Sequence, residues 1–244
     1  MKTLRGILAG LALMGAAAAS SAPASAQPNW GGLYIGAHVG GAWTEMDWGL
    51  NYPNGNPPPS SSFDRDGSIL GGHIGIQHQF GQWVLGAEVS LSDGFGAKNI
   101  TGINLWSPQV GDLRTHMGPL VTATGRVGYS MNRWLGYVKA GFAGANIRLD
   151  ADDNVPPDYG FSTRNFHNGW TAGVGVEHMF SDNVIFGLEY NYVDLGQSVT
   201  NTVVVLATGA PAGGTAASNV DTTVHAVTAR ISFKFGRPAA VAEP

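Results

Sequence analysis

The chain has 244 residues, of which 43% are hydrophobic and only 12% are charged, and its formal net charge is −4. This negative charge argues against nucleic acid as a partner, because affinity for phosphates depends on clustered Lys and Arg. The sequence contains no cysteine, so an oxidising compartment is allowed but a disulfide framework is excluded.

The N-terminus has the pattern of a cleaved secretion signal. Lys2 and Arg5 precede an apolar stretch, Ile7–Ala19, and Ala24-Ser25-Ala26 forms a small-x-small cleavage site. The alternative is a membrane anchor, but this stretch is short, and no later run approaches the roughly 20 apolar residues of a transmembrane helix. We therefore expect a signal peptide at 1–26.

Eight later segments read as β-strands, and their connections alternate between very short and long. Turns of two or three residues begin at Gly81, Asn132 and Ser181, whereas the other connections are long and rich in Gly, Pro, Ser, Asp and Asn. This sorting of loops by length is typical of an up-and-down transmembrane β-barrel. The candidate strands are Trp30–Trp43, Ser68–Phe80, Trp83–Leu91, Leu120–Met131, Trp134–Ile147, Gly169–Phe180, Val184–Asp194 and Thr223–Phe235.

The sequence therefore predicts an all-β fold, an eight-stranded antiparallel up-and-down transmembrane β-barrel at 27–235. Residues 236–244 would be a short periplasmic tail, with both termini periplasmic and the long loops outside the cell. Alternation supports a wall with two faces: Leu85 and Val89 lie on one side of their strand, and Gly86 and Glu88 lie on the other.

Aromatic residues concentrate near the ends of the predicted strands. Amphipathic rings favour the headgroup level of a membrane, so we expect two aromatic girdles rather than ordinary core aromatics. The girdle near the short turns would contain Trp30, Phe80, Trp83, Trp134 and Phe180, and the girdle near the long loops Trp43, Trp170, Tyr190 and Tyr192.

Alternation also points six charged residues into the lumen at similar depth. They are Glu88, Arg126, Lys139, Glu177, Glu189 and Arg230. Each charge has a neighbour of opposite sign on an adjacent strand, and the expected pairs are Glu88–Arg126, Lys139–Glu177 and Glu189–Arg230. Paired ions are tolerable in a dry interior whereas a lone ion is costly, which favours a network that plugs the barrel. A conduction or proton-relay role is the alternative, although an eight-stranded lumen is only wide enough for side chains.

Several strand motifs resemble the small outer-membrane β-barrel proteins of Gram-negative bacteria, in particular the alphaproteobacterial surface-antigen or "porin family" branch. The motifs are Trp30-Gly-Gly-Leu-Tyr-Ile-Gly-Ala37, Gly125-Arg-Val-Gly-Tyr129 followed by Arg133-Trp134, Gly169-Trp170 with Gly173 and Gly175, and Leu188-Glu189-Tyr190-x-Tyr192-x-Asp194-Leu195-Gly196. The resemblance implies the outer membrane as location and recognition by its assembly machinery. Family members commonly end on an aromatic residue, whereas here Phe235 is followed by nine further residues.

Motifs for chemistry are weak. None of the histidines begins a His-x-Ser pair, and no Gly-x-Ser-x-Gly elbow, P-loop or His-Glu-x-x-His occurs. Asp150, Asp152, Asp153 and Asn154 suggest Ca²⁺, but Val155 replaces the turn glycine of such loops, so a solvated acidic loop is the better interpretation. We expect no enzyme activity, cofactor or metal.

The expected function is a structural and surface-interaction barrel that supports envelope integrity and presents long extracellular loops to a ligand or host. The expected partners are outer-membrane lipid, lipopolysaccharide and the assembly machinery. A small diffusion channel is the second interpretation, and an outer-membrane enzyme is the third.

Overall fold

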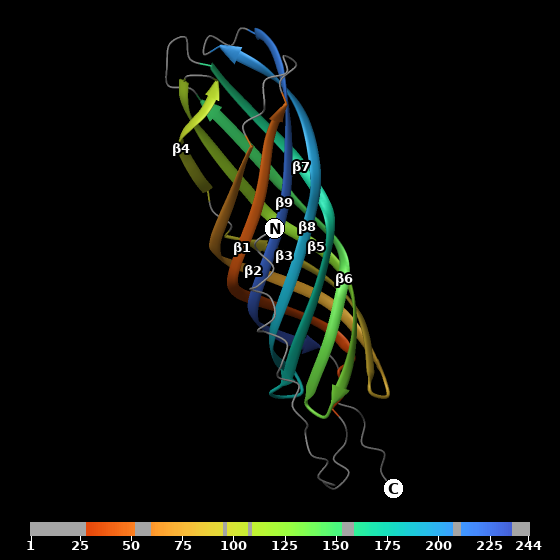
Figure 1. Ribbon diagram of the computed structural model, residues 1–244. Helices are drawn as coiled ribbons and strands as arrows, with labels where there is room; N and C mark the ends of the chain where they lie inside the picture. Colours follow the sequence, from red (N-terminus) through yellow and green to blue (C-terminus); the bar gives the residue numbers. More distant parts are fainter. Residues whose placement is uncertain are drawn as a thin grey trace, which may run out of the picture. The chain divides into compact units, whose positions relative to one another are not determined.

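The computed structural model describes residues 28–51, 60–94, 97–106, 109–152, 159–206 and 211–235, and these residues form antiparallel strands (Figure 1). The predicted signal peptide and the tail at 236–244 lie outside the described residues. The strands are β1 (Gly32–Asn51), β2 (Ser60–Phe80), β3 (Trp83–Asp93), β4 (Ala97–Trp106), β5 (Gln109–Met131), β6 (Trp134–Asp152), β7 (Tyr159–Met179), β8 (Val184–Leu206) and β9 (Pro211–Phe235).

Eight of these strands close into a ring. Their order is β3-β2-β1-β9-β8-β7-β6-β5, and β3 pairs with β5, from Trp83 opposite Tyr129 to Ser92 opposite Leu120. The predicted eight-stranded antiparallel barrel is therefore confirmed. Closure leaves none of these strands with an unpaired edge in the ring, which a wall surrounded by lipid requires.

The strands extend further than the sequence predicted. β1 and β2 remain paired beyond Trp43, with Trp48 opposite Ser61, in a region that the sequence indicated as a loop. A further strand, β4, pairs with the first part of β5, where the sequence also indicated a loop. Gly, Pro and Ser favour turns locally, but the paired backbone groups of a hairpin outweigh that preference here. Most ring strands contain 19 to 25 residues, about twice the 9–11 that cross a bilayer.

Two of the short turns depend on the left-handed backbone region. Gly81, between β2 and β3, has φ of 61°, and Asn132, between β5 and β6, has φ of 56°. Tight hairpin turns that match the twist of a sheet require positive φ, which Gly and Asn adopt readily. Leu33 pairs with Phe235 at this same end of the barrel, so the first and last described strands begin and end beside the short turns.

The outer wall is apolar. Leu70, Ile76, Val138 and Leu188 are at least 59% exposed on the outer face of the barrel, as a surface covered by hydrocarbon requires. No helix among the described residues has the length and apolar character needed to cross a membrane.

Aromatic side chains lie on the outer face near both ends. The exposed members of the predicted girdles are Phe80, Trp83, Trp134 and Phe180 near the short turns and Trp43 and Trp170 towards the other end. Tyr190 and Tyr192 are half-buried, because they contact His225: the Tyr190 hydroxyl lies 2.8 Å from His225 Nδ1, and the Tyr192 ring meets His225 edge-on. His225 also stacks on Trp43.

Candidate functional site: the barrel lumen

Inward-facing side chains fill the barrel in layers. Alternation along the strands brings the six predicted lumen charges together in the middle layer, where each is between 2% and 6% exposed. Three carboxylates from β3, β7 and β8 face three cations from β5, β6 and β9, so the formal charges of this cluster balance. We call Glu88, Arg126, Lys139, Glu177, Glu189 and Arg230 the lumen network.

Arg230 contacts all three carboxylates of the lumen network. Its Nη2 lies 2.5 Å from Glu88 Oε2, its Nη1 lies 2.5 Å from Glu189 Oε2, and its Nε lies 3.5 Å from Glu177 Oε1. One guanidinium thus contacts carboxylates from three strands. A planar group with five donors suits this role better than an ammonium.

The other two cations, Arg126 and Lys139, form their shortest ion pairs with carboxylates two strands away in the ring. Arg126 forms a two-pronged pair with Glu177, with N···O distances of 2.7 and 3.2 Å, and lies 3.6 Å from Glu88. The Nζ of Lys139 donates to Glu189 at 2.7 Å and to Glu88 at 3.2 Å.

These partners differ in part from the expected pairs. Glu189–Arg230 is present and Glu88–Arg126 is a longer contact, but the structure gives Lys139 partners other than Glu177. The cause is register: Arg126 and Lys139 stand opposite each other on β5 and β6, and strand tilt carries each side chain past its immediate neighbour. The sequence gives the distance of each charge from the end of its strand, but it does not give the tilt of the strands and therefore not the final partners.

Two tyrosines that the sequence did not single out complete the hydrogen bonding of the lumen network. Tyr34 donates to Glu88 at 2.9 Å and accepts from Arg126 at 3.1 Å. Tyr137 donates to Glu189 at 2.5 Å and accepts from Arg230 at 3.1 Å. The Arg126 guanidinium also lies 3.9 Å above the Tyr137 ring centre, a favourable cation–π position. The sequence did contain a signal for both tyrosines. Each lies two residues before an inward-facing residue, Gly36 or Lys139, and so shares its face of the strand.

Glycines on the inner wall make room for these long side chains. Gly187 stands in register between Glu177 and Arg230, and a Cβ there would lie 2.9 Å from the Cγ of each. A Cβ on Gly175 would lie 2.4 Å from the Tyr137 ring. The inner wall is therefore indented where the lumen network is thickest.

Below the lumen network, beside the short turns, an apolar cluster closes the barrel. Trp30 is 0% exposed, so its predicted place in a girdle is wrong: the chain enters β1 with this ring turned inward. The carbonyl of Trp30 accepts from Gln77 Nε2 at 2.6 Å, and its amide donates to Gln79 Oε1 at 2.7 Å. The mouth cluster consists of Trp30, Val84, Leu135, Tyr137, Met179 and Ile185.

Lys234 is a further inward-facing cation that the sequence analysis did not include. It is buried at the same mouth, and its Nζ donates to the carbonyl of Asn29. Alternation from Arg230 along β9 placed it inward in principle.

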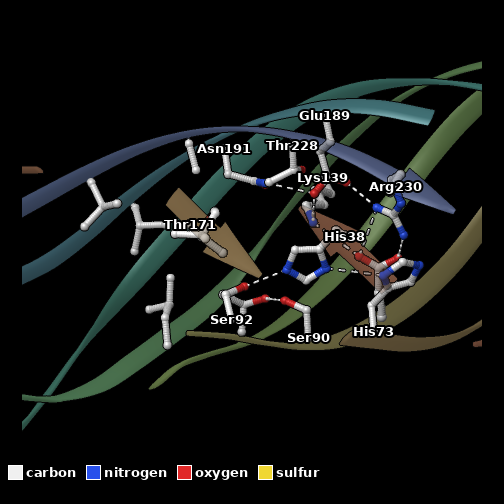
Figure 2. Close-up of a pocket in the computed structure, with 17 residues that line it drawn as sticks. His38, His73, Ser90, Ser92, Lys139, Thr171, Glu189, Asn191, Thr228 and Arg230 are labelled. Atoms are coloured by element: carbon white, nitrogen blue, oxygen red, sulfur yellow. Dashed lines mark hydrogen bonds and ion pairs between the residues drawn. The ribbon is translucent and has the colours of Figure 1, made fainter. Parts of the chain in front are cut away.

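Above the lumen network lies a small cavity with both polar and apolar lining residues (Figure 2). Its volume is about 30 Å³, and it is lined by His38, His73, Ser92, Lys139, Glu189 and Arg230 among others. A water molecule needs about 10–15 Å³ measured in this way, so the cavity has room for two or three waters. Inward-facing apolar residues enclose it on the side away from the short turns; they include Ile69, Leu120, Val193 and Val224.

The described residues offer little for metal or covalent chemistry. They contain no group of three or more His, Cys, Asp or Glu that could hold a metal ion. Asp150 and Asp152 belong to β6, and Asp153 and Asn154 of the acidic segment lie outside the described residues. Ser92 Oγ lies 2.8 Å from His38 Nε2, but this pair is enclosed in the lumen beside a cavity of about 30 Å³.

Comparisons with known proteins agree with this architecture. The family model described as "Outer membrane protein beta-barrel domain" matches residues 9–235. A relative, the 25 kDa outer-membrane immunogenic protein of Brucella ovis, is 28% identical over 175 residues, which cover 71% of this chain and 73% of the relative.

Solved structures show the same fold. The outer membrane protein OprG of Pseudomonas aeruginosa has a TM-score of 0.56 at 13% identity and covers 85% of this chain and 97% of its own. The outer membrane protease OmpT of Escherichia coli has a TM-score of 0.55 at 9% identity, with 84% and 97% covered. From its sequence match and its closed barrel, the chain belongs to the family of outer membrane protein beta-barrel domains.

Proposed function

We propose that this protein is a closed structural barrel of the outer membrane, and that its protruding hairpins make contacts outside the cell. The observation that carries the proposal is the lumen network, whose six ions are buried and cross-paired between opposite walls. The mouth cluster around Trp30 adds a second obstruction in series. Together they support a structural scaffold rather than a path for solutes.

The main alternative is a small diffusion channel, and conductance in planar bilayers tests it. We expect the mature protein, refolded and inserted, to give no stepwise current at neutral pH, because the buried lumen network and the apolar mouth cluster leave no continuous water path. Arg126→Met should remain silent too, while its unfolding midpoint falls. Steps of current in the wild type, altered in size by Arg126→Met without a loss of stability, would establish the channel instead.

The proposed orientation places the short turns in the periplasm and the hairpin ends outside. The natural chain contains no cysteine, so single introduced cysteines can report the orientation of the barrel without background labelling. Ser60→Cys at the start of β2 should react with a membrane-impermeant maleimide on intact cells, whereas Asp182→Cys in a short turn should react only after lysis. The reverse labelling would invert the topology.

Surface contact is supported by two features. The strands continue well beyond the length that a bilayer needs, and a Brucella relative is named an immunogenic protein of the outer membrane. Lipopolysaccharide is the lipid partner that we propose for the outer aromatic row of Trp43, Trp170, Tyr190 and Tyr192. The assembly machinery would recognise β9, which ends on Phe233 and Phe235.

An outer-membrane enzyme is the third candidate. The Ser92–His38 pair is the observation in its favour, since a serine hydroxyl beside an imidazole is the core of many acyl-transfer sites. The neighbouring cavity is too small for any acyl substrate. A lipid A mass profile that changes in a deletion strain, and returns with wild type but not with Ser92→Ala, would favour the enzyme.

A further inference from the structure

Two histidines face each other inside the barrel, and the lumen network does not account for them. His38 on β1 and His73 on β2 are both buried, with ring centroids 5.7 Å apart and planes 25° from parallel. Their Nδ1 atoms lie 3.5 Å apart in hydrogen-bonding geometry. Figure 2 shows the pair at the cavity above the lumen network, between Ser92 and Arg230.

The remaining ring nitrogens are also occupied. His38 Nε2 lies 2.8 Å from Ser92 Oγ on β3, and His73 Nε2 lies 2.8 Å from Ser232 Oγ on β9. The result is one hydrogen-bonded chain, Ser92–His38–His73–Ser232, that joins the four adjacent strands β3, β2, β1 and β9. Glycine makes room for each ring: a Cβ on Gly36 would lie 2.4 Å from His73, and one on Gly71 would lie 2.4 Å from His38.

This geometry limits how many protons the pair can hold. An Nδ1–Nδ1 hydrogen bond needs one ring to donate and the other to accept, so the two neutral rings must be opposite tautomers. One ring can become imidazolium and still donate. When both rings are imidazolium, two N–H groups point at each other and the bond cannot exist.

The charges around the pair do not relieve that conflict. Those that face it are Arg230 on β9, Glu88 on β3, Lys139 on β6 and Glu189 on β8, and the ring of Tyr34 on β1 lies 6.1 Å from His73. β5 and β7 contribute Thr122 and Thr171 to the cavity wall, but no charge. Both carboxylates are already paired with Arg230 and Lys139, so a second proton on the histidines would have no free counter-ion in this layer.

We propose that His38 and His73 form an acid-sensitive latch. The latch holds β3, β2, β1 and β9 together while the pair carries at most one extra proton, and it separates when both rings are protonated. This role goes beyond the proposed scaffold function, because it gives one side of the barrel wall a stability that depends on external pH.

Acid should lower the stability of the latched barrel, because the unfolded chain can bind more protons at these two histidines than the folded barrel can. An imidazole in the unfolded chain takes up its proton below about pH 6.5, so the unfolded chain gains two protons here while the latched barrel gains one at most. Stability rises with pH wherever the unfolded state binds more protons. As pH falls below about 6.5, the unfolding equilibrium constant should therefore increase by about tenfold per pH unit for the missing proton.

The first test is ¹⁵N NMR of the histidine rings in the full mature barrel in micelles. At pH 7.5 we expect one of His38 and His73 to be the Nδ1–H tautomer and the other to be the Nε2–H tautomer. Identical tautomers, or two imidazolium rings at pH 5 in a barrel whose β1 and β2 signals are unchanged, would overturn the latch.

The second test compares urea unfolding in lipid vesicles at pH 7.5 and pH 5. The wild type should lose stability on acidification, and His38→Gln and His73→Gln should each remove that loss, because a Gln oxygen accepts from a protonated neighbour. His78→Gln, on the outer face beside Phe80, is the matched control and should behave as the wild type. The proposal fails if His38→Gln and His78→Gln show the same acid dependence.

Discussion

Two adjacent layers of the lumen both fill the interior of the barrel, one with charged side chains and the other with apolar ones. The middle layer closes the barrel with six ions that are held in place by hydrogen bonds, whereas the mouth cluster closes it with the rings and aliphatic chains around Trp30. Both layers are buried, and both are built on the same alternating strands. Their difference is in what a single substitution leaves behind: an unpaired charge in one case and a void in the other.

That contrast predicts different patterns of failure. Ions in a dry interior have already lost their hydration, so removing one partner leaves the other uncompensated. An apolar cluster loses only the contacts and burial of the atoms removed, and neighbours can partly fill the gap. A single substitution should therefore lower the free energy of unfolding more in the middle layer than in the mouth cluster.

The largest effect is expected for Arg230→Met, since this guanidinium contacts three carboxylates. Loss of one partner from a buried ion pair costs about 3–5 kcal/mol, and we expect the upper part of that range. Urea unfolding in vesicles at pH 7.5 measures it. Arg133→Met is the matched control, because Arg133 forms an exposed pair with Asp182 at 4.0 Å, and such pairs contribute about 0–1 kcal/mol. Equal losses would show that the lumen network is hydrated.

A smaller effect is expected at the mouth. Trp30→Ala should cost about 3 kcal/mol, the lower end of the range for truncation of a buried Trp, because neighbouring side chains can partly fill the space. Trp83→Ala removes the same side chain from the outer face near the same turns, where it is 56% exposed. The urea midpoints of the two variants measure the difference. A larger loss of stability for Trp83→Ala would show that the ring on the outer face contributes more to stability than the ring of Trp30 in the mouth cluster.

The smallest effect is a coupling energy that identifies partners. Arg126→Met and Glu177→Gln together should cost less than the sum of the two single changes, with a coupling of about 1–3 kcal/mol. Glu189→Gln is the control partner, because Glu189 bonds to Lys139 and Arg230. If Arg126→Met couples more strongly to Glu189→Gln than to Glu177→Gln, the pairing across β5 and β7 is wrong.

Much of the fold was predictable because the barrel wall depends on a period of two. Alternation identified the ring strands and the inward direction of Glu88 and Arg126, since a shift of one residue would place an ion in lipid. The full length of β1 and the existence of β4 were not predictable. They lie in connections that are rich in turn-forming residues as a whole, and pairing across a hairpin is a long-range property that cannot be read from composition.

The site was predictable in its members and less so in its contacts. The layer of ions follows from alternation, but the choice of Glu177 by Arg126 depends on barrel tilt. Trp30 precedes the first strand, so no alternation constrained its direction, and its ring closes the mouth instead of meeting lipid. His38 and His73 are 35 residues apart in the chain, and only the pairing of β1 with β2 brings them together.

The reach of Arg230 has a consequence for how the protein is assembled. Its hydrogen bonds to Glu88 join residues separated by 142 positions, and the partners of Glu88 come from β5, β6 and β9. The β5–β6 hairpin carries two cations, Arg126 and Lys139, and the β7–β8 hairpin carries two carboxylates, Glu177 and Glu189, so a sheet formed from either hairpin alone would bring unpaired ions into hydrocarbon. We therefore expect insertion and ring closure to occur as one concerted event, which is slow because its contacts are distant in sequence.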